Sequence, residues 1–440
     1  MLPSRRLDRF SRIIQLRTVS RQPGEPVDTR PFISMGRLLR ELFPAVHRSF
    51  RRETVAEASL LYTLEGTDGS LEPVMLTAHL DVVPAEAGEG WPHPPFSGTV
   101  ANGRVWGRGT IDYKLGVSGM LEACEELMEE GFSPARTIIL AFGHDEETGG
   151  DSGAAGIVEL LGRRGVRLRS VLDEGGYIYS YPWLDGDVAV VGLAEKGYLT
   201  LRLTAAGEQG HASVPATVTA AGRLCRALAR LEDRQMEARL CEPVRMMLEG
   251  TAHMFRDRDK RTYSPPEMIA ELEKYPSGNA LVRTTTAVTM LKGSDKENVL
   301  PGRPWALVNF RAVPGDHSGR IMSHVRDTVR DLDITVEFED DRHIHQPSDI
   351  SSAATPEYRA IKDALEETWP GTPVVPGVFP AATDSRHYCS LADNVYRFQP
   401  VHLGPRGLSS LHSRGESVST EDYCRAVTFY REYVRRVCST

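Results

Sequence analysis

The sequence predicts an α/β protein, in which a mainly parallel sheet is flanked by helices and a second, α+β domain is inserted into the chain. In the first part of the chain, short apolar runs alternate with amphipathic segments, the order typical of parallel strands joined by helices. Near residue 198 the pattern changes to alternating apolar and polar residues, and after residue 340 the earlier pattern returns. We therefore expect one domain from residues 1–197 and 341–440, with an inserted domain at residues 198–340.

Apolar spacing and breaker residues predict the elements of the first part. Phe32, Met35 and Leu39 recur at helical spacing, whereas residues 137–142 are apolar enough for a strand buried on both faces. The expected elements are a helix at 28–44, a strand at 74–80, a Pro- and Gly-rich loop at 84–109, a helix from about Val117 to Met128 that ends at Gly131, a strand at 137–142, a helix at 151–164 and a strand at 166–172.

The inserted part shows the two-residue period of strands that are buried on one face, as in Leu199, Leu201 and Leu203. The expected elements are a strand around 199–203, a helix at 217–231, strands at 282–291 and 305–312, a helix at 316–331 and a strand at 334–338. This βαββαβ order predicts a ferredoxin-like unit, with a polar, helix-prone stretch at 232–274 inserted in it. The chain is expected to end in a helix at 420–437.

Composition and charge argue against several classes of partner. The chain has 52 Lys and Arg against 60 Asp and Glu, a formal net charge of -8, so neither nucleic acid nor a membrane is an expected partner. Its apolar runs are shorter than the ~20 residues of a membrane span, and its start lacks the apolar core of a signal peptide, so we expect a cytoplasmic protein. Six scattered cysteines without a C-x-x-C pair predict reduced thiols.

Acidic residues and histidines directly follow three of the predicted strands. They are His79 and Asp81 after the first, His144, Asp145, Glu146 and Glu147 after the second, and Asp173 and Glu174 after the third. Ligands bind at the carboxyl ends of parallel strands, so these groups are expected at one edge of the sheet. A single carboxylate there is an ordinary solvated charge, but several together repel each other unless a cation neutralises them. Imidazole with carboxylates suits Zn²⁺, with Mn²⁺ or Co²⁺ as substitutes.

Other catalytic motifs are absent from the sequence, including G-x-S-x-G, H-E-x-x-H and the P-loop. His343-Ile344-His345 looks like a metal-binding pair but stands alone in a polar segment. We interpret it as a structural or surface feature, because nothing nearby adds carboxylate or thiolate ligands.

Several motifs together resemble the dizinc metallopeptidases that include aminoacylase, carboxypeptidase S and glutamate carboxypeptidase. They are His79-Leu80-Asp81-Val82-Val83-Pro84, Gly107-Arg108-Gly109-Thr110-Ile111-Asp112, Gly143-His144-Asp145-Glu146-Glu147 and Leu172-Asp173-Glu174-Gly175-Gly176. Further segments are similar to the branch of carboxypeptidase S and the N-fatty-acyl-amino-acid synthase/hydrolase: Glu195-Lys196-Gly197, Arg283-Thr284-Thr285-Thr286, Asn298-Val299-Leu300-Pro301, Thr383-Asp384-Ser385-Arg386 and Tyr396-Arg397-Phe398. The resemblance covers nearly the whole chain and implies the zinc-exopeptidase fold.

The resemblance implies a set of metal ligands. His79 and Asp173 would bind one zinc, Glu147 and His412 the other, and Asp112 would bridge both. Asp81 would orient the imidazole of His79, and the Asp112-Tyr113 bond would be cis. The usual His-Gly-x-Asn-Glu of the family reads His412-Ser413-Arg414-Gly415-Glu416 here, and Ala382 replaces the usual Gly before Thr383.

The resemblance also implies the catalytic and substrate-binding residues. Glu146 adjoins a ligand and is the expected general base, the alternative being a residue that only positions that ligand. His211, in Gly210-His211-Ala212-Ser213, would stabilise the oxyanion from the inserted domain. Asn298, Arg311 and Arg386 would hold a substrate carboxylate, although a surface ion pair is the simpler interpretation of each Arg.

The function implied is zinc-dependent hydrolysis of an amide or peptide bond that releases an amino acid with a free carboxylate, from a peptide or an N-acyl amino acid. The alternative is a non-catalytic protein that binds such a ligand on the same fold. The resemblance further implies a homodimer formed through the inserted domain, with His211 serving the partner's zincs. A monomer is the alternative if the stretch at 232–274 covers the edge of the inserted sheet.

Overall fold

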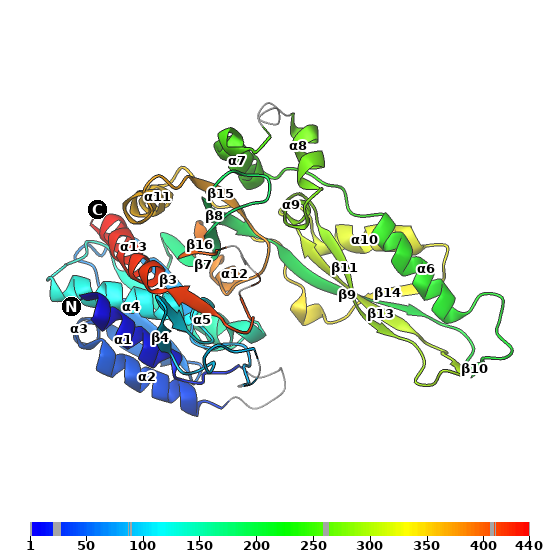
Figure 1. Cartoon of the computed structure of the whole chain (residues 1–440), viewed down its shortest axis with the longest axis horizontal. Helices are drawn as coiled ribbons and strands as arrows, with labels where there is room; N and C mark the ends of the chain where they lie inside the picture. The colour runs from blue at the N-terminus through cyan, green and yellow to red at the C-terminus, as the bar shows by residue number, and fades with distance from the viewer. Residues whose placement is uncertain are drawn as a thin grey trace.

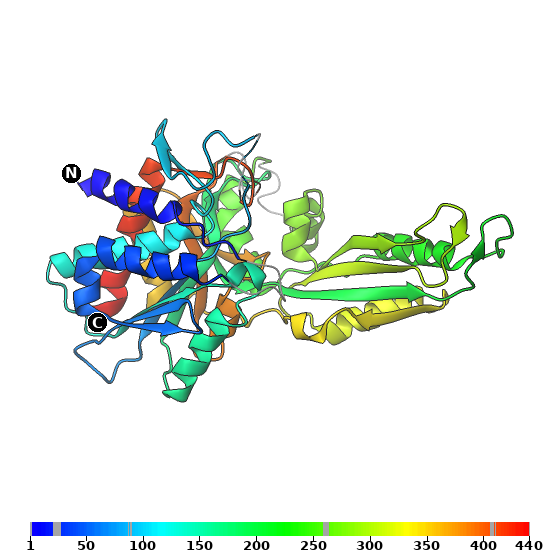
Figure 2. The ribbon, with the colours of Figure 1, turned by 90° about the horizontal axis from the view of Figure 1, so that it is seen from below.

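The computed structural model describes residues 2–20, 28–86, 88, 90–257, 264–404, 409 and 411–439. Residues 87 and 89 of the expected loop at 84–109, and residues 258–263 of the expected insertion at 232–274, lie outside this set. The molecule is elongated, with a large α/β body from which a narrower arm projects (Figure 1, Figure 2). We define the arm as residues 197–233 and 285–338.

The body is built on a sheet in the order β1-β2-β6-β3-β7-β16-β8-β15, as far as the described residues show. Its strands are β1 Arg51–Val55, β2 Ser59–Leu64, β3 Val74–His79, β6 Ile138–Gly143, β7 Ser170–Tyr179, β8 Val188–Glu195, β15 Val374–Phe379 and β16 Val395–His402. The central strands β6, β3, β7 and β16 are parallel, and β15 is parallel to β8, whereas β1 and β2 form an antiparallel hairpin. The expectation of a mainly parallel sheet is confirmed.

Helices cover both faces of this sheet (Figure 2). One face carries α1 Leu2–Ile14, α2 Arg30–Leu42, α3 Pro44–Ser49, α4 Lys114–Glu129, α11 Pro356–Thr368 and α13 Thr420–Cys438, and the other carries α5 Gly153–Arg163 and α12 Ser385–Tyr388. Strand alternation explains the apolar runs, because Leu140 and Phe142 pack under the first group while Ile139 and Ala141 pack under the second.

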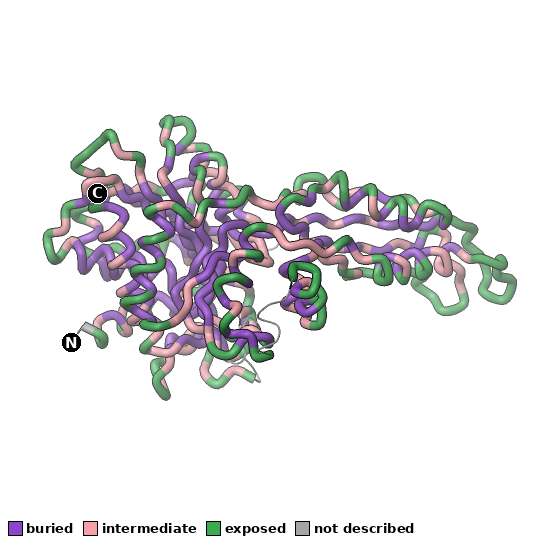
Figure 3. Tube along the Cα trace, turned by 90° about the horizontal axis from the view of Figure 1, so that it is seen from above, coloured by how far each residue is buried: buried purple, intermediate pink, exposed green. Residues whose placement is uncertain are grey.

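The arm is the expected ferredoxin-like unit. It consists of β9 Gly197–Ala205, α6 Ala220–Asp233, β11 Thr285–Lys292, β13 Trp305–Ala312, α10 Ser318–Val329 and β14 Ile334–Phe338, with the antiparallel order β11-β13-β9-β14. Leu199, Leu201 and Leu203 face α6 and α10, which explains their two-residue period. Figure 3 shows the resulting line of buried residues along the arm between exposed outer surfaces.

The stretch between α6 and β11 does not belong to the arm, contrary to its expected place in the inserted domain. It contains α7 Glu242–Thr251, α8 Pro265–Leu272 and α9 Pro276–Val282, which pack on β8 and β15 of the body (Figure 1). Val244, Met247 and Leu248 form a helical stripe that contacts Val190 and Val375. The polar composition of this stretch concealed the stripe, which buries one edge of the body sheet.

Two further differences affect the site. The strand expected at 166–172 is β7, which begins at Ser170 and continues through the two acidic residues to Tyr179. A small sheet of β4 Thr99–Ala101, β5 Arg104–Trp106 and β17 Ser417–Ser419 joins the expected loop to the C-terminal part of the chain. The Asp112-Tyr113 peptide bond is cis, and all six cysteines are free. Among the described residues, no helix combines the length and the apolar character that a membrane crossing requires.

Candidate active site

Asp81 organises one corner of the carboxyl edge of the sheet. His79 ends β3, and its Nδ1 lies 2.9 Å from the backbone oxygen of Asp81 and 3.4 Å from the carboxylate of that residue. The same carboxylate accepts hydrogen bonds from the backbone N–H groups of Glu146 (3.2 Å) and Glu147 (3.1 Å). Both Asp81 and His79 are buried. Asp81 therefore fixes the imidazole ring and the turn that follows β6 at the same time.

Asp112 lies between two histidines that are distant in the sequence. Its Oδ1 is 3.1 Å from Nε2 of His79, and its Oδ2 is 2.8 Å from Nε2 of His412. Oε2 of Glu147 lies 3.4 Å from the same Nε2 of His412. The two oxygens of Asp112 thus face two different groups, which is the arrangement that a bridging carboxylate requires.

The buried carboxylate of Glu416 holds the loop that carries Asp112. It accepts backbone N–H bonds from Gly109 (3.1 Å), Ile111 (2.8 Å) and Asp112 (3.2 Å). It also accepts a bond of 2.6 Å from Arg108, which donates a second bond of 3.0 Å to the backbone oxygen of His412. Arg108 and Glu416 therefore couple the position of Asp112 to that of His412.

Two groups of three residues among the described part of the chain have the chemistry of metal ligands. They are His79, Asp112 and Glu174, and Asp112, Glu147 and His412, and in each group the candidate ligand atoms lie within 4.8 Å of one another. The expected ligand Asp173 belongs to neither group, and Glu174 stands in its place. Neighbouring residues of a strand point in different directions, and here it is Glu174 whose carboxylate lies beside His79. Oε1 of Glu174 lies 3.5 Å from Nε2 of His79, whereas Oδ1 of Asp173 accepts from the backbone N–H of Glu174.

The charge of the site requires compensation. Asp112, Glu146, Glu147 and Glu174 meet here, and burial raises the pKa of Glu174 to about 8 and that of Glu146 well above its usual range. Bound divalent cations would neutralise these carboxylates, and the imidazole and carboxylate donors match the ligands that zinc prefers. The residues present therefore fit a pair of metal ions with Asp112 shared between them.

The donor groups line a cavity of about 670 Å³ between the body and the base of the arm. The arm contributes Tyr198 and Arg311, and the segment after the arm contributes His343 and His345. Both histidines form part of the cavity wall, and neither belongs to a group of candidate metal ligands among the described residues. Burial, followed by repulsion from Arg386, lowers the pKa of His345 to about 4, so its ring is neutral near pH 7.

The residues expected to bind substrate fall into two places. Arg311 and Arg386 both line the cavity. Arg311 stacks on the ring of Tyr198 at 4.6 Å, and Arg386 donates to the backbone oxygens of Thr383 (2.7 Å) and Gly149. These contacts hold both guanidinium groups at the wall, where they can face an anionic substrate.

Asn298 and His211 lie together elsewhere, at the end of the arm furthest from the body (Figure 1). The strand β10 Gly210–His211 pairs with β12 Val299–Leu300, and the backbone oxygen of Asn298 accepts from Ala212 at 3.0 Å. His211 is exposed, and its Nδ1 lies 2.7 Å from the hydroxyl of Ser213. The structure does not bring these two residues to the cavity within one chain.

Gly415 stands where the usual motif has Asn, and its backbone conformation explains why Gly is suitable there. Its φ is +84°, in the left-handed region, which Gly and Asn both tolerate better than other residues. Gly in place of the usual Asn therefore suits this turn, and Glu416 follows in position to hold the loop of Asp112.

Comparison with known proteins agrees with this geometry. Residues 75–436 match the model of peptidase family M20/M25/M40. The chain is 39% identical over 436 residues to the N-fatty-acyl-amino acid synthase/hydrolase PM20D1.1 of Danio rerio, covering 96% of this chain and 84% of that protein. It is 34% identical over 413 residues to the probable carboxypeptidase S-like 2 of Dictyostelium discoideum, covering 92% and 79%. The branch that the sequence motifs resembled is confirmed.

Solved structures share the fold. Human carnosine dipeptidase 1 superposes with a TM-score of 0.69 at 16% identity, covering 98% of this chain and 96% of its own. The M20 metallo-carboxypeptidase Sso-CP2 of Sulfolobus solfataricus gives the same TM-score at 16% identity, covering 98% of each chain. With the family match and the relatives above, these findings show that the chain belongs to peptidase family M20/M25/M40 and is a hydrolase.

Proposed function

We propose that this hydrolase holds two Zn²⁺ ions, one by His79, Asp112 and Glu174 and the other by Asp112, Glu147 and His412. The observation that carries the proposal is that Asp112 belongs to both donor groups. The carboxylate of Glu146 lines the same cavity and belongs to neither group. Mn²⁺ or Co²⁺ can replace zinc with the same kinds of ligand. When bound, the ions supply an acidified water and polarise the scissile carbonyl.

Glu146 is the proposed general base. It lines the cavity beside Glu147, and the hydrogen bond from its backbone N–H to Asp81 holds its backbone next to the donor groups. It takes a proton from the attacking water and delivers that proton to the nitrogen of the leaving amine. Burial raises the pKa of its carboxyl group, whereas the positive charge of bound cations would favour the carboxylate that the first of these steps requires.

The proposed substrate is a peptide or N-acyl amino acid whose amine side carries a free carboxylate. Arg311 and Arg386 supply cationic groups in the cavity wall, and guanidinium matches a carboxylate with two parallel hydrogen bonds. The names of the relatives point to the same two kinds of substrate, carboxypeptidase and N-acyl-amino-acid substrates.

A panel of substrates tests this proposal. Zinc-loaded protein is assayed with N-acyl amino acids, dipeptides, and the same compounds with the carboxylate converted to an amide. Release of the amino acid from the free acids, with kcat/KM at least about tenfold lower for the amidated forms, is the expected result. Metal-loaded protein that hydrolyses no member of the panel would overturn the proposal in favour of a binding protein.

Two variants test which of two neighbouring carboxylates, Glu174 or Asp173, is the third ligand of the first zinc. Glu174→Ala should lower the zinc content from two to about one per chain, because Glu174 and not Asp173 faces His79. Asp173→Asn is the matched comparison and should retain both ions, since Asp173 belongs to neither donor group and its Oδ1 accepts from the backbone N–H of Glu174. Zinc per chain is measured by elemental analysis after dialysis. The opposite pattern, with loss in Asp173→Asn alone, would restore Asp173 as the ligand.

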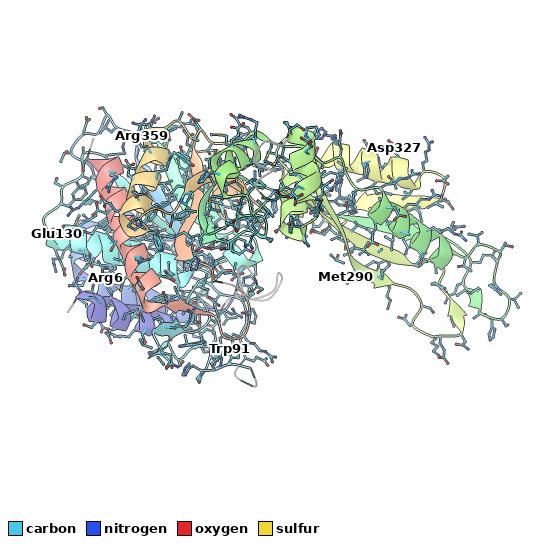
Figure 4. The ribbon with its side chains drawn as sticks, turned by 45° about the horizontal axis from the view of Figure 1, so that its top comes forward. Arg6, Trp91, Glu130, Met290, Asp327 and Arg359 are labelled. Carbon is cyan, nitrogen blue, oxygen red and sulfur yellow. The ribbon has the colours of Figure 1, made fainter. Side chains whose placement is uncertain are left out.

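We further propose a homodimer in which His211 of each chain reaches the cavity of its partner. His211 lies far from its own cavity, so a second chain is a direct source for this group. Within the described part of the chain β11 is an edge strand of the arm sheet, and its Met290 and Leu291 are exposed, which suits pairing with a second copy. Figure 4 shows Met290 on the arm, while Arg6 and Glu130 lie at the opposite end of the molecule.

Mixing two inactive variants tests the exchange of His211. His211→Ala and Glu146→Gln proteins are combined under conditions that exchange subunits. Half of a random mixture is heterodimer with one complete site in two, so about a quarter of the parental activity should return. Native mass spectrometry confirms the exchange, and each variant alone is the control. If heterodimers form and activity stays absent, His211 does not act across the interface.

A further inference from the structure

A second cavity lies beside the catalytic one. It has a volume of about 190 Å³ and is formed where α9 crosses β7, β8 and β15. Three glycines, Gly175, Gly176 and Gly192, line it from the strands, so the backbone forms this part of the wall. None of the described residues that line it is charged. An uncharged hollow of this kind is suited to an apolar group and not to a carboxylate.

The walls of this second cavity are apolar and firmly placed. Val190, Leu281 and Val378 line it and belong to the buried cluster that joins α7, α8 and α9 to the body sheet. The Nζ of Lys196 donates to the backbone oxygens of Ala280 (2.9 Å) and Arg283 (2.8 Å), which ties the end of α9 to the junction between body and arm. The segment that fell outside the arm therefore supplies one wall of the cavity.

The two cavities adjoin each other at Tyr177 and Phe379, which line both of them. Glu174, a donor residue, lies on the same strand as the lining residues Gly175 and Tyr177, so the apolar space begins next to the reacting centre. A substrate with its carboxylate at Arg311 or Arg386 and its carbonyl over the donor groups has two parts left to place, its acyl part and the side chain of its amino acid. The acyl part is attached to the carbonyl itself, so it is the part that starts at the donor groups, next to Glu174. The boundary formed by Tyr177 and Phe379 is where the charged lining changes to an apolar one.

We propose that this second cavity binds the apolar acyl group of the substrate and measures its length. A cavity of about 150 Å³ lined by aliphatic and aromatic side chains holds benzene, so 190 Å³ accommodates an acyl group of about six to eight carbons. A chain of sixteen carbons extends beyond it and gains nothing further from these walls. The proposal rests on the proposed function, since it concerns the same substrate.

A chain-length series tests the proposal with the metal-loaded full chain. N-acetyl, N-hexanoyl, N-octanoyl and N-hexadecanoyl derivatives of one amino acid are compared. Each added methylene that is buried should raise kcat/KM by up to about fourfold, and the rise should stop near octanoyl. Ala280→Phe places a ring in the cavity and should reduce the ratio of octanoyl to acetyl kcat/KM at least about tenfold. Ser277→Phe, from the same helix, is the second variant if the first does not fold.

Ala270→Phe is the matched control, because Ala270 is exposed on α8 of the same segment. It should leave the chain-length profile unchanged. The cavity proposal would be overturned if kcat/KM of the parent did not change with acyl chain length, or if Ala280→Phe and Ala270→Phe showed the same dependence. Hydrolysis of the acetyl derivative tests the proposed function separately, because its acyl group is too short to fill the cavity. Calorimetric affinity of Glu146→Gln protein for octanoyl and acetyl compounds decides the matter independently of turnover. If it binds octanoyl more tightly and the parent cleaves none of the series, the proposed function fails and the cavity assignment stands.

Discussion

Glu146→Gln protein should retain two metal ions per chain and lose at least about a thousandfold in kcat. The amide occupies the same space as the carboxylate, and the backbone N–H of residue 146 still donates to Asp81. Glu146 is in neither donor group, so the metal content has no reason to fall. The amide cannot accept a proton from water at neutral pH, and the step that it disables is the chemical one.

The measurement combines elemental analysis with single-turnover kinetics on the same preparation. Glu159→Gln, an exposed change of the same type on the neighbouring helix α5, should leave kcat and metal content at the parental values. A Glu146→Gln protein with activity within tenfold of the parent would show that another group moves the proton. A protein that lost its metal would show instead that Glu146 positions the donor groups.

Sequence pattern predicted the elements whose burial is uniform along their length. The strands at 74–79 and 138–143 are buried on both faces, and the arm strands carry a clean two-residue period, so each was visible as a pattern. The segment with α7 to α9 was misplaced, because only one narrow stripe of each helix is apolar and the partner of that stripe is a sheet edge formed by β8 and β15. The location of such a partner is a tertiary property that local composition does not contain.

The choice between Asp173 and Glu174 shows where motif reading stops. The two carboxylates are adjacent on β7, so their side chains point in different directions, and the direction of each depends on the local register of that strand. The pairing of β7 with β16 also shifts register between Asp173 and Gly176, and Gly175 has φ +134°. Register and bulges come from the packed sheet, so the position of Glu174 beside His79 was not visible in the sequence, and Asp173 stays a prediction that the two variants above test.

The sequence also did not reveal the contacts of residues that position others, such as Glu416. Glu416 holds three backbone N–H groups of the Asp112 loop across more than 300 positions of sequence, with separations of 307, 305 and 304. Glu416 was recognised as part of the motif at 412–416, but its contacts depend on the small sheet that pairs β17 with β5. The second cavity is a further example, since its walls come from three strands and a helix that only the fold brings together.

Asp112→Ala should remove both metal ions and reduce activity to the background of the assay. A carboxylate shared by two ions contributes to both binding sites, and without it the two dications lose the anion that separates them. The loop itself should remain in place, because Glu416 bonds to the backbone N–H of residue 112 and not to its side chain. Asp112→Asn keeps the shape but not the charge, and the same loss is expected from it.

Elemental analysis after dialysis measures the loss, and thermal unfolding in a chelator checks that variant and parent have comparable stability without metal. Asp151→Ala is the matched control, since Asp151 is exposed near the turn of Glu146 but belongs to neither donor group. Its metal content should equal that of the parent. Loss of a single ion in Asp112→Ala would place Asp112 at one site only. Because its two oxygens lie 3.1 Å from His79 and 2.8 Å from His412, the geometry leads us to expect the loss of both.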